Sequence, residues 1–185
     1  MTNSRLGVDL IVPILCQATR ETLEQCTGRE IVFSPTIQKI PKISIRPDLG
    51  GFVEIFGDYN GLVVMNFSAE AALAIYHYYM MNMGIPENDL ASHASSVEVA
   101  DSIGELINQI MGHSQQLVET SYNLNAHSGQ PKALTLNRAI SLTPELSIGN
   151  AGSSASIDNR RISFQMEQLH FYMEIAMERT EFISL

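Results

Sequence analysis

The longest regular pattern in the chain is helical and runs from Ser95-Ser96-Val97-Glu98 to the neighbourhood of Asn123. Its four opening residues have the form of a capping box, in which Ser and Glu side chains satisfy free N–H groups at a helix N-terminus. Apolar residues recur along the segment with a period of about 3.6 and define one face that must be buried. That face consists of Val99, Ile103, Leu106, Ile107, Ile110, Met111, Ser114, Leu117 and Val118. Any fold of this chain therefore has to cover one side of a long helix.

The opposite face of this helix carries a polar stripe. Asp101, Glu105, Asn108 and Gly112 fall within a wedge of roughly 60° when successive residues are turned by about 100°. Contact with water alone would explain the two carboxylates. It does not explain the other two residues, because Asn is a poor helix former and a Gly inside a helix costs about 1 kcal/mol relative to Ala. A glycine one turn beyond a carboxamide indicates that another molecule comes close there.

Residues Asp101 to Gly112, read as D-x-x-x-E-x-x-N-x-x-x-G, resemble the signature helix of the CheC/CheX/FliY family of chemotaxis phosphatases. The order of segments along nearly the whole chain is also similar to this family, most of all to CheX. The resemblance implies a protein built from two similar halves, each opening with a long helix. In CheC both of these helices carry the E-x-x-N pair.

The first half of this chain lacks that pair. When the two halves are aligned by the turns that follow their helices, Leu10 and Pro13 stand where the Glu and Asn would be. A single site with a proline in the first helix is what CheX-like proteins show, although Val12-Pro13-Ile14 occupies the place of their frequent Asn-Pro-Phe. The segment Glu21-x-x-Glu24-x-x-x-Gly28 repeats the spacing too far along the helix, and we interpret it as coincidence.

The remaining segments alternate between helical and extended patterns. A helix from Val8 to Cys26 has Pro13 near its first turn and Gly28 as its stop signal. Ser68 can cap another helix, Ala69–Met83, which is apolar almost all round, so we expect it to be buried on more than one side. We interpret its Met and Tyr residues as core, with a partner interface as the less favoured alternative. The extended segments are Glu30–Phe33, Lys39–Ile45, Gly51–Gly57 and Leu62–Phe67 as a hairpin around Asp58-Tyr59-Asn60-Gly61, then Ala133–Leu142 in pieces, Ile162–Met166 and Leu169–Met177.

Helix, strands, helix, helix, strands is the order of an α+β fold. We expect a largely antiparallel curved sheet with long helices packed on one face, and the resemblance adds pseudo-duplicated halves. With 185 residues, the chain should form one CheX-like domain over residues 1–185. The alternation in Leu169–Met177 is out of phase with the strand before it, which a tight turn or a bulge at Glu167-Gln168 would explain. The segment Gly149–Ser156 is interpreted as a flexible connection and not as a phosphate-binding loop, because it lacks a Walker lysine and a following helix.

The acidic composition argues against several classes of partner. The formal net charge is −9 and no run of Lys and Arg compensates it locally, so we expect neither nucleic acid nor an anionic membrane surface as a partner. No apolar stretch approaches the roughly 20 residues of a membrane span and Met1–Leu10 lacks a secretion signal, so we expect a cytoplasmic protein. The two cysteines, Cys16 and Cys26, are about 15 Å apart along one predicted helix, which is too far for a disulfide. We interpret both as reduced packing residues.

In the family, the substrate is a CheY-like receiver domain of a response regulator that bears a phosphoaspartate, and the resemblance implies this substrate class here. The acyl phosphate is already labile and Mg²⁺ in the receiver neutralises part of its charge, so we expect no cofactor or metal of the chain's own. Asn108 is the candidate that holds a water molecule in line for attack. Glu105 matches the acidic residue that pairs with the receiver's active-site lysine. Gly112 would leave room for the receiver backbone, and Asp101 would be a docking contact.

Two other classes of function stay open. A non-catalytic receiver-binding or flagellar-switch-like module could share the fold, but it would have no need of both Glu105 and Asn108. A metal-dependent hydrolase is suggested only by five histidines that show no paired ligand spacing, namely His77, His93, His113, His127 and His170. CheX-like proteins pair through a sheet edge, so we also expect a homodimer, with the long strands near the C-terminus leaving that edge open.

Overall fold

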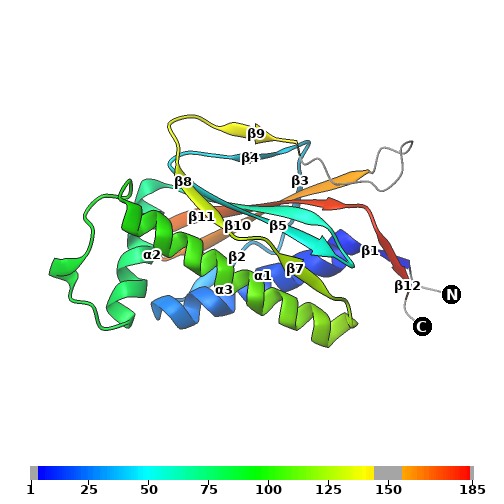
Figure 1. The fold of residues 1–185 in the computed structure, drawn as a ribbon, viewed down its shortest axis with the longest axis horizontal. Coiled ribbons are helices and arrows are strands. Elements are labelled where there is room, and N and C mark those ends of the chain that lie inside the picture. Colours follow the sequence, from blue (N-terminus) through cyan, green and yellow to red (C-terminus); the bar gives the residue numbers. More distant parts are fainter. Residues whose placement is uncertain (1–3, 144–155, 184–185) are drawn as a thin grey trace.

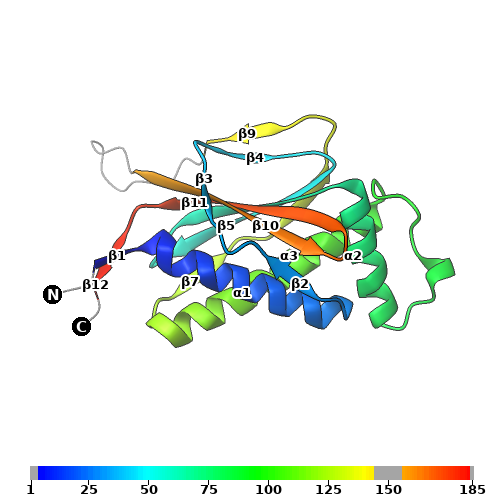
Figure 2. The same ribbon diagram turned by 180° about the vertical axis from the view of Figure 1, so that it is seen from behind.

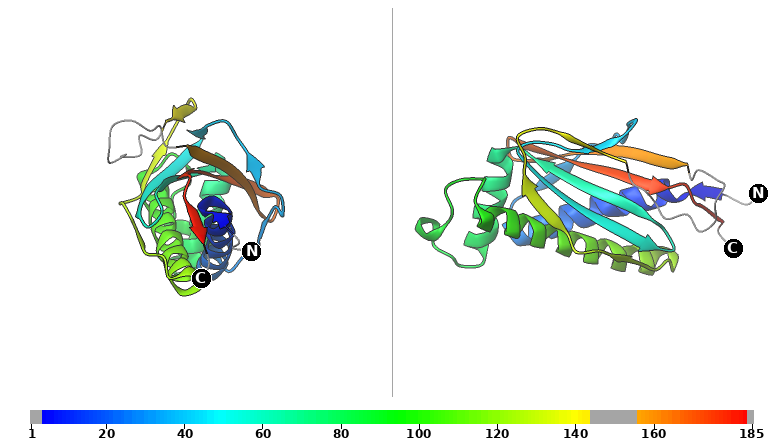
Figure 3. Two further views of the ribbon diagram at one scale, coloured as in Figure 1. Left: turned by 90° about the vertical axis from the view of Figure 1, so that its right-hand side faces the viewer. Right: turned by 45° about the horizontal axis from the view of Figure 1, so that its top comes forward.

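The computed structural model describes residues 4–143 and 156–183 and has three layers (Figure 1). The helices lie below a curled eight-stranded sheet, and a two-stranded ribbon lies above it. Seen from the end, the sheet bends around the helices (Figure 3). The predicted α+β class and the curved antiparallel sheet with helices on one face are confirmed. The helices are α1 (Gly7–Thr27), α2 (Ala69–Asn82) and α3 (Val97–Tyr122), with a short 3₁₀ helix at Glu87–Asp89.

The sheet places two long antiparallel hairpins side by side at its centre. The strand order is β2-β10-β11-β6-β5-β7, with β3 beside β10 and β8 beside β5. Each central hairpin, β5–β6 and β10–β11, follows a long helix in the chain, and the two meet through β6 and β11. The strands are β1 (Ser4–Leu6), β2 (Ile31–Phe33), β3 (Gln38–Lys39), β4 (Ile43–Ile45), β5 (Leu49–Gly57), β6 (Gly61–Phe67), β7 (Ala126–Ser128), β8 (Lys132–Thr135), β9 (Ile140–Leu142), β10 (Ile157–Met166), β11 (Leu169–Glu178) and β12 (Glu181–Ile183).

Helix α3 follows the predicted pattern closely. Its apolar face is buried and its N-cap is Ser96, whose side chain accepts a hydrogen bond from the Val99 backbone N–H at 3.4 Å. The capping box starting at Ser95 therefore placed the helix start one residue too early. The helix ends at Tyr122, and its C-cap Asn123 takes a left-handed conformation with φ 53°, as Asn tolerates.

Helix α1 lies antiparallel beside α3 and is seen from the other side in Figure 2. It begins at Gly7, so Pro13 lies in its second turn rather than near its first, as we expected. The ring is exposed, so the helical hydrogen bond that proline removes is on the side that water can reach. Gly28 follows the last helical residue with φ 65°, which confirms it as the stop signal.

Helix α2 differs from its expected burial. Its N-cap is Ser68, as predicted, but it is buried on one side only, through Ala71, Ala72, Ile75 and Tyr76. The helix stands at one end of the sheet, and its last turns project beyond the sheet (Figure 1). Met81 and Met83 are therefore exposed, at 37% and 62%, and the expectation that all its Met and Tyr residues belong to the core is wrong.

The observed strands match those predicted from the sequence, except where pairing with a distant segment determines the bounds of a strand. The β5–β6 hairpin is confirmed, as is the turn at Glu167, which has φ 56°. The expected strand Lys39–Ile45 is divided at Pro41, because proline has no N–H to continue a ladder: β3 pairs with β10, and β4 leaves the sheet to pair with β9. Strand β10 starts at Ile157, five residues before the expected Ile162. The three-residue strands β1, β7 and β12 were not predicted.

The edges of the sheet lie elsewhere than expected. We predicted that the long C-terminal strands leave an open edge, but β10 is flanked by β2 and β3, and β11 is flanked by β6. Short strands thus cover the long ones, which is a common protection of a sheet edge. The loop interpreted at Gly149–Ser156 lies outside the described residues, except for Ser156. Among the helices that the structure describes, none combines the length and apolarity needed to cross a membrane.

Candidate functional site

The polar stripe of α3 lies on the surface of the folded chain. Asp101, Glu105, Asn108 and Gly112 are all exposed, while the opposite face of the helix packs against α1 and the sheet. The rotation of the helix is fixed by close packing: a Cβ atom added at Gly51 of β5 would lie 2.2 Å from Cδ1 of Ile107. The absent side chain lets α3 approach the sheet, and this approach leaves the stripe facing outward.

Three of the four predicted residues line one cleft. Asp101, Glu105 and Asn108 form its wall on α3, together with Ala100 and Gly104. The other wall is the segment from Gln130 to Ala133, which includes the start of β8, and the cavity between them holds about 250 Å³. The two walls lie close together at Gly104, since a Cβ atom there would lie 3.9 Å from the Cβ of Ala133. The second wall and Gly104 were missed from the sequence; a second glycine inside the helix was the available signal.

Asn108 and Gly112, the last two residues of the stripe, differ in their surroundings. Within residues 4–143 and 156–183, the Asn108 side chain has no hydrogen-bond partner, so its amide is free to bind a ligand or water. Gly112 lies one turn beyond and does not line the cleft. A Cβ atom added there would meet no described atom within 4 Å, so the space beside this glycine is open in the isolated chain.

Glu105 belongs to a network that joins all three helices. The Gln109 side chain donates a hydrogen bond to Glu105 Oε1 at 3.2 Å and to the Tyr79 hydroxyl of α2 at 3.3 Å. The Cys26 thiol of α1 donates to Gln109 Oε1 at 3.3 Å. Burial raises the pKa of Cys26, and the negative charge of Glu105 raises that pKa further, so the thiol stays protonated.

The other candidate groups have structural partners. Cys16 is buried, which raises its pKa to about 12 and makes it a packing residue, and both cysteines are free thiols. His113 bridges α3 to α1, with Nδ1 3.3 Å from the Thr22 hydroxyl and Nε2 3.4 Å from Glu21. In the part of the chain that the structure describes, no three His, Cys, Asp or Glu side chains are grouped closely enough to hold a metal ion.

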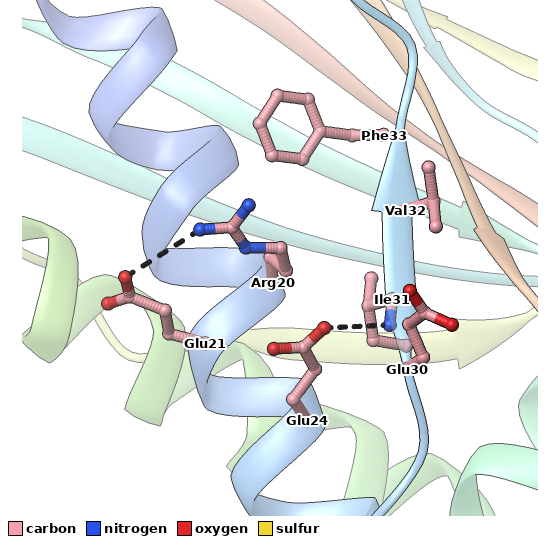
Figure 4. Close-up of a pocket in the computed structure, with 7 residues that line it drawn as sticks. All are labelled: Arg20, Glu21, Glu24, Glu30, Ile31, Val32 and Phe33. Carbon is pink, nitrogen blue, oxygen red and sulfur yellow. Dashed lines mark hydrogen bonds and ion pairs between the residues drawn. The ribbon is translucent and has the colours of Figure 1, made fainter.

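A second cleft, of about 510 Å³, lies between α1 and β2 and is lined in part by Glu21 and Glu24, the two carboxylates of the repeat that we interpreted as coincidental (Figure 4). Glu24 points to β2 and accepts a hydrogen bond from the Ile31 backbone N–H at 3.0 Å. Glu21 accepts a hydrogen bond from Gln17 at 2.9 Å and lies 3.9 Å from Arg20. These carboxylates are engaged in holding α1 to its neighbours, unlike the free amide of Asn108.

The chain has a CheX-like fold that carries this exposed helix face. The CheX protein of Desulfovibrio desulfuricans superposes with a TM-score of 0.72 at 17% identity, covering 91% of this chain and 99% of that one. A CheC-like superfamily protein from a Shewanella species gives 0.70 at 15% identity, with coverages of 91% and 97%. CheX of Borrelia burgdorferi, in its complex with CheY, BeF₃ and Mg²⁺, gives 0.62 at 16% identity, with coverages of 91% and 97%. The resemblance to the CheC/CheX/FliY family is thus confirmed at the level of the fold.

By sequence, the chain belongs to the family described as protein of unknown function (DUF3334), which matches residues 2–185. No curated protein matches the sequence significantly.

Proposed function

We propose that this chain binds the phosphorylated receiver domain of a response regulator and accelerates hydrolysis of its phosphoaspartate. The observation that carries the proposal is the exposed Glu105–Asn108 pair, one turn apart and lining one cleft on a CheX-like fold. A neighbour of the same fold has been crystallised with CheY, BeF₃ and Mg²⁺, which supports a receiver domain as the partner.

The proposed reaction requires few catalytic groups from the chain itself. The phosphoaspartate is a labile acyl phosphate, and Mg²⁺ bound in the receiver offsets part of its charge. The Asn108 amide accepts a hydrogen bond from a water molecule and holds it in line with the phosphorus atom. Because Asn108 is exposed and has no partner among the described residues, it can enter the receiver's site without breaking a contact of its own. No covalent intermediate and no general base are required.

The neighbouring residues would fix the docking geometry. The Glu105 carboxylate, exposed one turn before Asn108, pairs with the active-site lysine of the receiver and sets the register of the two proteins. Asp101 adds a contact at the edge of the cleft, and Gly112 admits the receiver backbone. The reaction takes place in the cytoplasm, where response regulators reside. The chain would act as a homodimer that pairs through an edge of the sheet, where the short strands β2, β3, β7 and β8 lie.

Replacing Gly112 with Ala should make the chain more stable but weaken its binding to the receiver. The free energy of unfolding should rise by about 0.5–1 kcal/mol, because Ala is the better helix former and the added Cβ meets no described atom within 4 Å. Affinity for the activated receiver should fall at least fivefold, or by about 1 kcal/mol, because the methyl group overfills a close interface. Chemical denaturation and isothermal titration calorimetry measure the two effects. A stabilised variant with unchanged affinity would show that the receiver does not approach Gly112.

The function is tested by charging a panel of purified receiver domains with labelled acetyl phosphate and Mg²⁺. We expect at least one receiver to lose its label faster in the presence of the chain, and faster again as more chain is added. Unchanged label on every receiver would contradict the proposal. Tight binding of a phosphorylated receiver without faster loss would instead support the non-catalytic receiver-binding module.

A further inference from the structure

We propose that Gln109 is a positioning residue that holds the Glu105 carboxylate at the cleft. This inference rests on the proposed function, because it concerns how Glu105 meets the receiver. Gln109 is half-buried and lies one turn after Glu105 on α3, facing the junction of the three helices rather than the solvent. It is not part of the D-x-x-x-E-x-x-N-x-x-x-G pattern.

The hydrogen bonds around Gln109 leave only one orientation of its amide. A carboxylate can only accept, so the NH₂ group must face Glu105, and this bond is 3.2 Å long. The carbonyl oxygen then faces the Cys26 thiol, which donates to it at 3.3 Å. The Tyr79 hydroxyl takes the remaining bond from the NH₂ group at 3.3 Å. Every polar atom of the amide therefore has a partner, and a flipped amide would place its oxygen against the carboxylate.

The anchors of Gln109 come from two other helices. Cys26 belongs to α1 and Tyr79 to α2, so the amide is fixed by the packing of the helices and not by α3 alone. Glu105 is exposed and would otherwise sample several rotamers. A carboxylate that is already oriented loses less side-chain freedom when it pairs with a cation on a partner. Gln109 should therefore strengthen docking without taking part in hydrolysis.

The chain contains a matched pair that lacks this arrangement. On α1, Gln17 donates to Glu21 at 2.9 Å across one helical turn, and neither residue lines the cleft between α3 and the segment from Gln130 to Ala133. Gln17 is exposed, and among the described residues its side chain forms a hydrogen bond to Glu21 only. The Gln17–Glu21 pair therefore serves as a control: it shows the effect of losing a Gln–Glu hydrogen bond on a helix outside the cleft.

The test compares Gln109→Leu with Gln17→Leu in steady-state dephosphorylation of the receiver. Gln109→Leu should raise KM threefold to tenfold and leave kcat within twofold, whereas Gln17→Leu should change neither. Gln109→Glu provides a second variant: it keeps an acceptor for the Cys26 thiol and can accept a hydrogen bond from the Tyr79 hydroxyl in place of the one that Gln109 donates, but it places a carboxylate beside Glu105. Its KM should rise at least as much as that of Gln109→Leu.

A double-mutant cycle with Glu105→Gln decides whether Gln109 acts through Glu105. We expect Gln109→Leu to raise KM by less than twofold in the Glu105→Gln background, because the carboxylate it positions is gone. An equal rise in both backgrounds, or an unchanged KM in the single variant, would overturn the inference while leaving the proposed function intact. A Glu105→Gln variant with wild-type KM would instead contradict the docking role of Glu105.

Discussion

Replacing Asn108 with Ala should lower the rate of phosphate release from the phosphorylated receiver at least tenfold and leave receiver binding nearly intact. The amide is expected to act on the attacking water, which matters in the transition state and hardly in the bound complex. A hundredfold loss would correspond to about 2.7 kcal/mol, which is within the range of one well-placed polar group. The substitution should not weaken the fold, because Asn108 is exposed and Ala is the better helix former. Steady-state kinetics and a binding titration with the BeF₃-activated receiver measure the two quantities.

Gln116→Ala is a suitable control for this result, since Gln116 is exposed on the same helix and does not line the cleft. Its kcat and affinity should equal those of the unmodified chain. If Asn108→Ala lost binding and hydrolysis to the same degree, Asn108 would be a docking residue, and the non-catalytic module would become the better description.

Reversing the charge of Glu105 should have the second large effect. In Glu105→Lys, a cation would face the receiver's lysine, so KM should rise at least tenfold, as expected for a close charge pair turned repulsive. The turnover number should change much less, because Asn108 is untouched. The salt dependence gives a further signature: KM of the unmodified chain should rise with ionic strength, whereas KM of the variant should fall or stay constant. Initial rates over a range of receiver concentrations at two salt concentrations measure this.

Glu119→Lys controls for the overall charge. Glu119 is exposed on the same helix outside the cleft, and either substitution changes the net charge from −9 to −7. Only the change at Glu105 should raise KM tenfold. An equal rise in both variants would mean that long-range attraction, and not a specific pair at Glu105, governs docking.

Local patterns were sufficient to predict the parts of the fold that each segment determines for itself. The 3.6-residue period of α3 correctly separated its buried face from the exposed stripe, and the turn sequence after Gly57 correctly predicted the β5–β6 hairpin. The burial of α2 was wrong because an apolar helix does not reveal where the sheet beneath it ends. Likewise, Pro41 marks where the Lys39–Ile45 segment breaks, but the pairing of its second part, β4, depends on β9, which lies about 100 residues further along the chain.

Only one wall of the cleft could be predicted from the sequence. The stripe on α3 followed from helical periodicity, but its opposing wall at Gln130–Ala133 is brought there by the pairing of β8 with β5. The setting of Gln109 also depends on the packing of three helices. Glu174 shows the same limit: it alternates with core residues along β11, yet it is fully buried. Strand β4 packs against β11 there, and Glu174 accepts hydrogen bonds from Arg161 and from the Ser44 N–H.

The most direct test of the proposed interface is a chemical-shift map of the isotope-labelled chain titrated with a receiver domain activated by BeF₃ and Mg²⁺. The largest changes should fall on Asp101, Glu105, Asn108 and Gly112 of α3 and on the facing segment from Gln130 to Ala133. Changes concentrated instead on the cleft between α1 and β2, or on the β4–β9 ribbon, would contradict the assignment of the α3 stripe as the surface that meets the receiver.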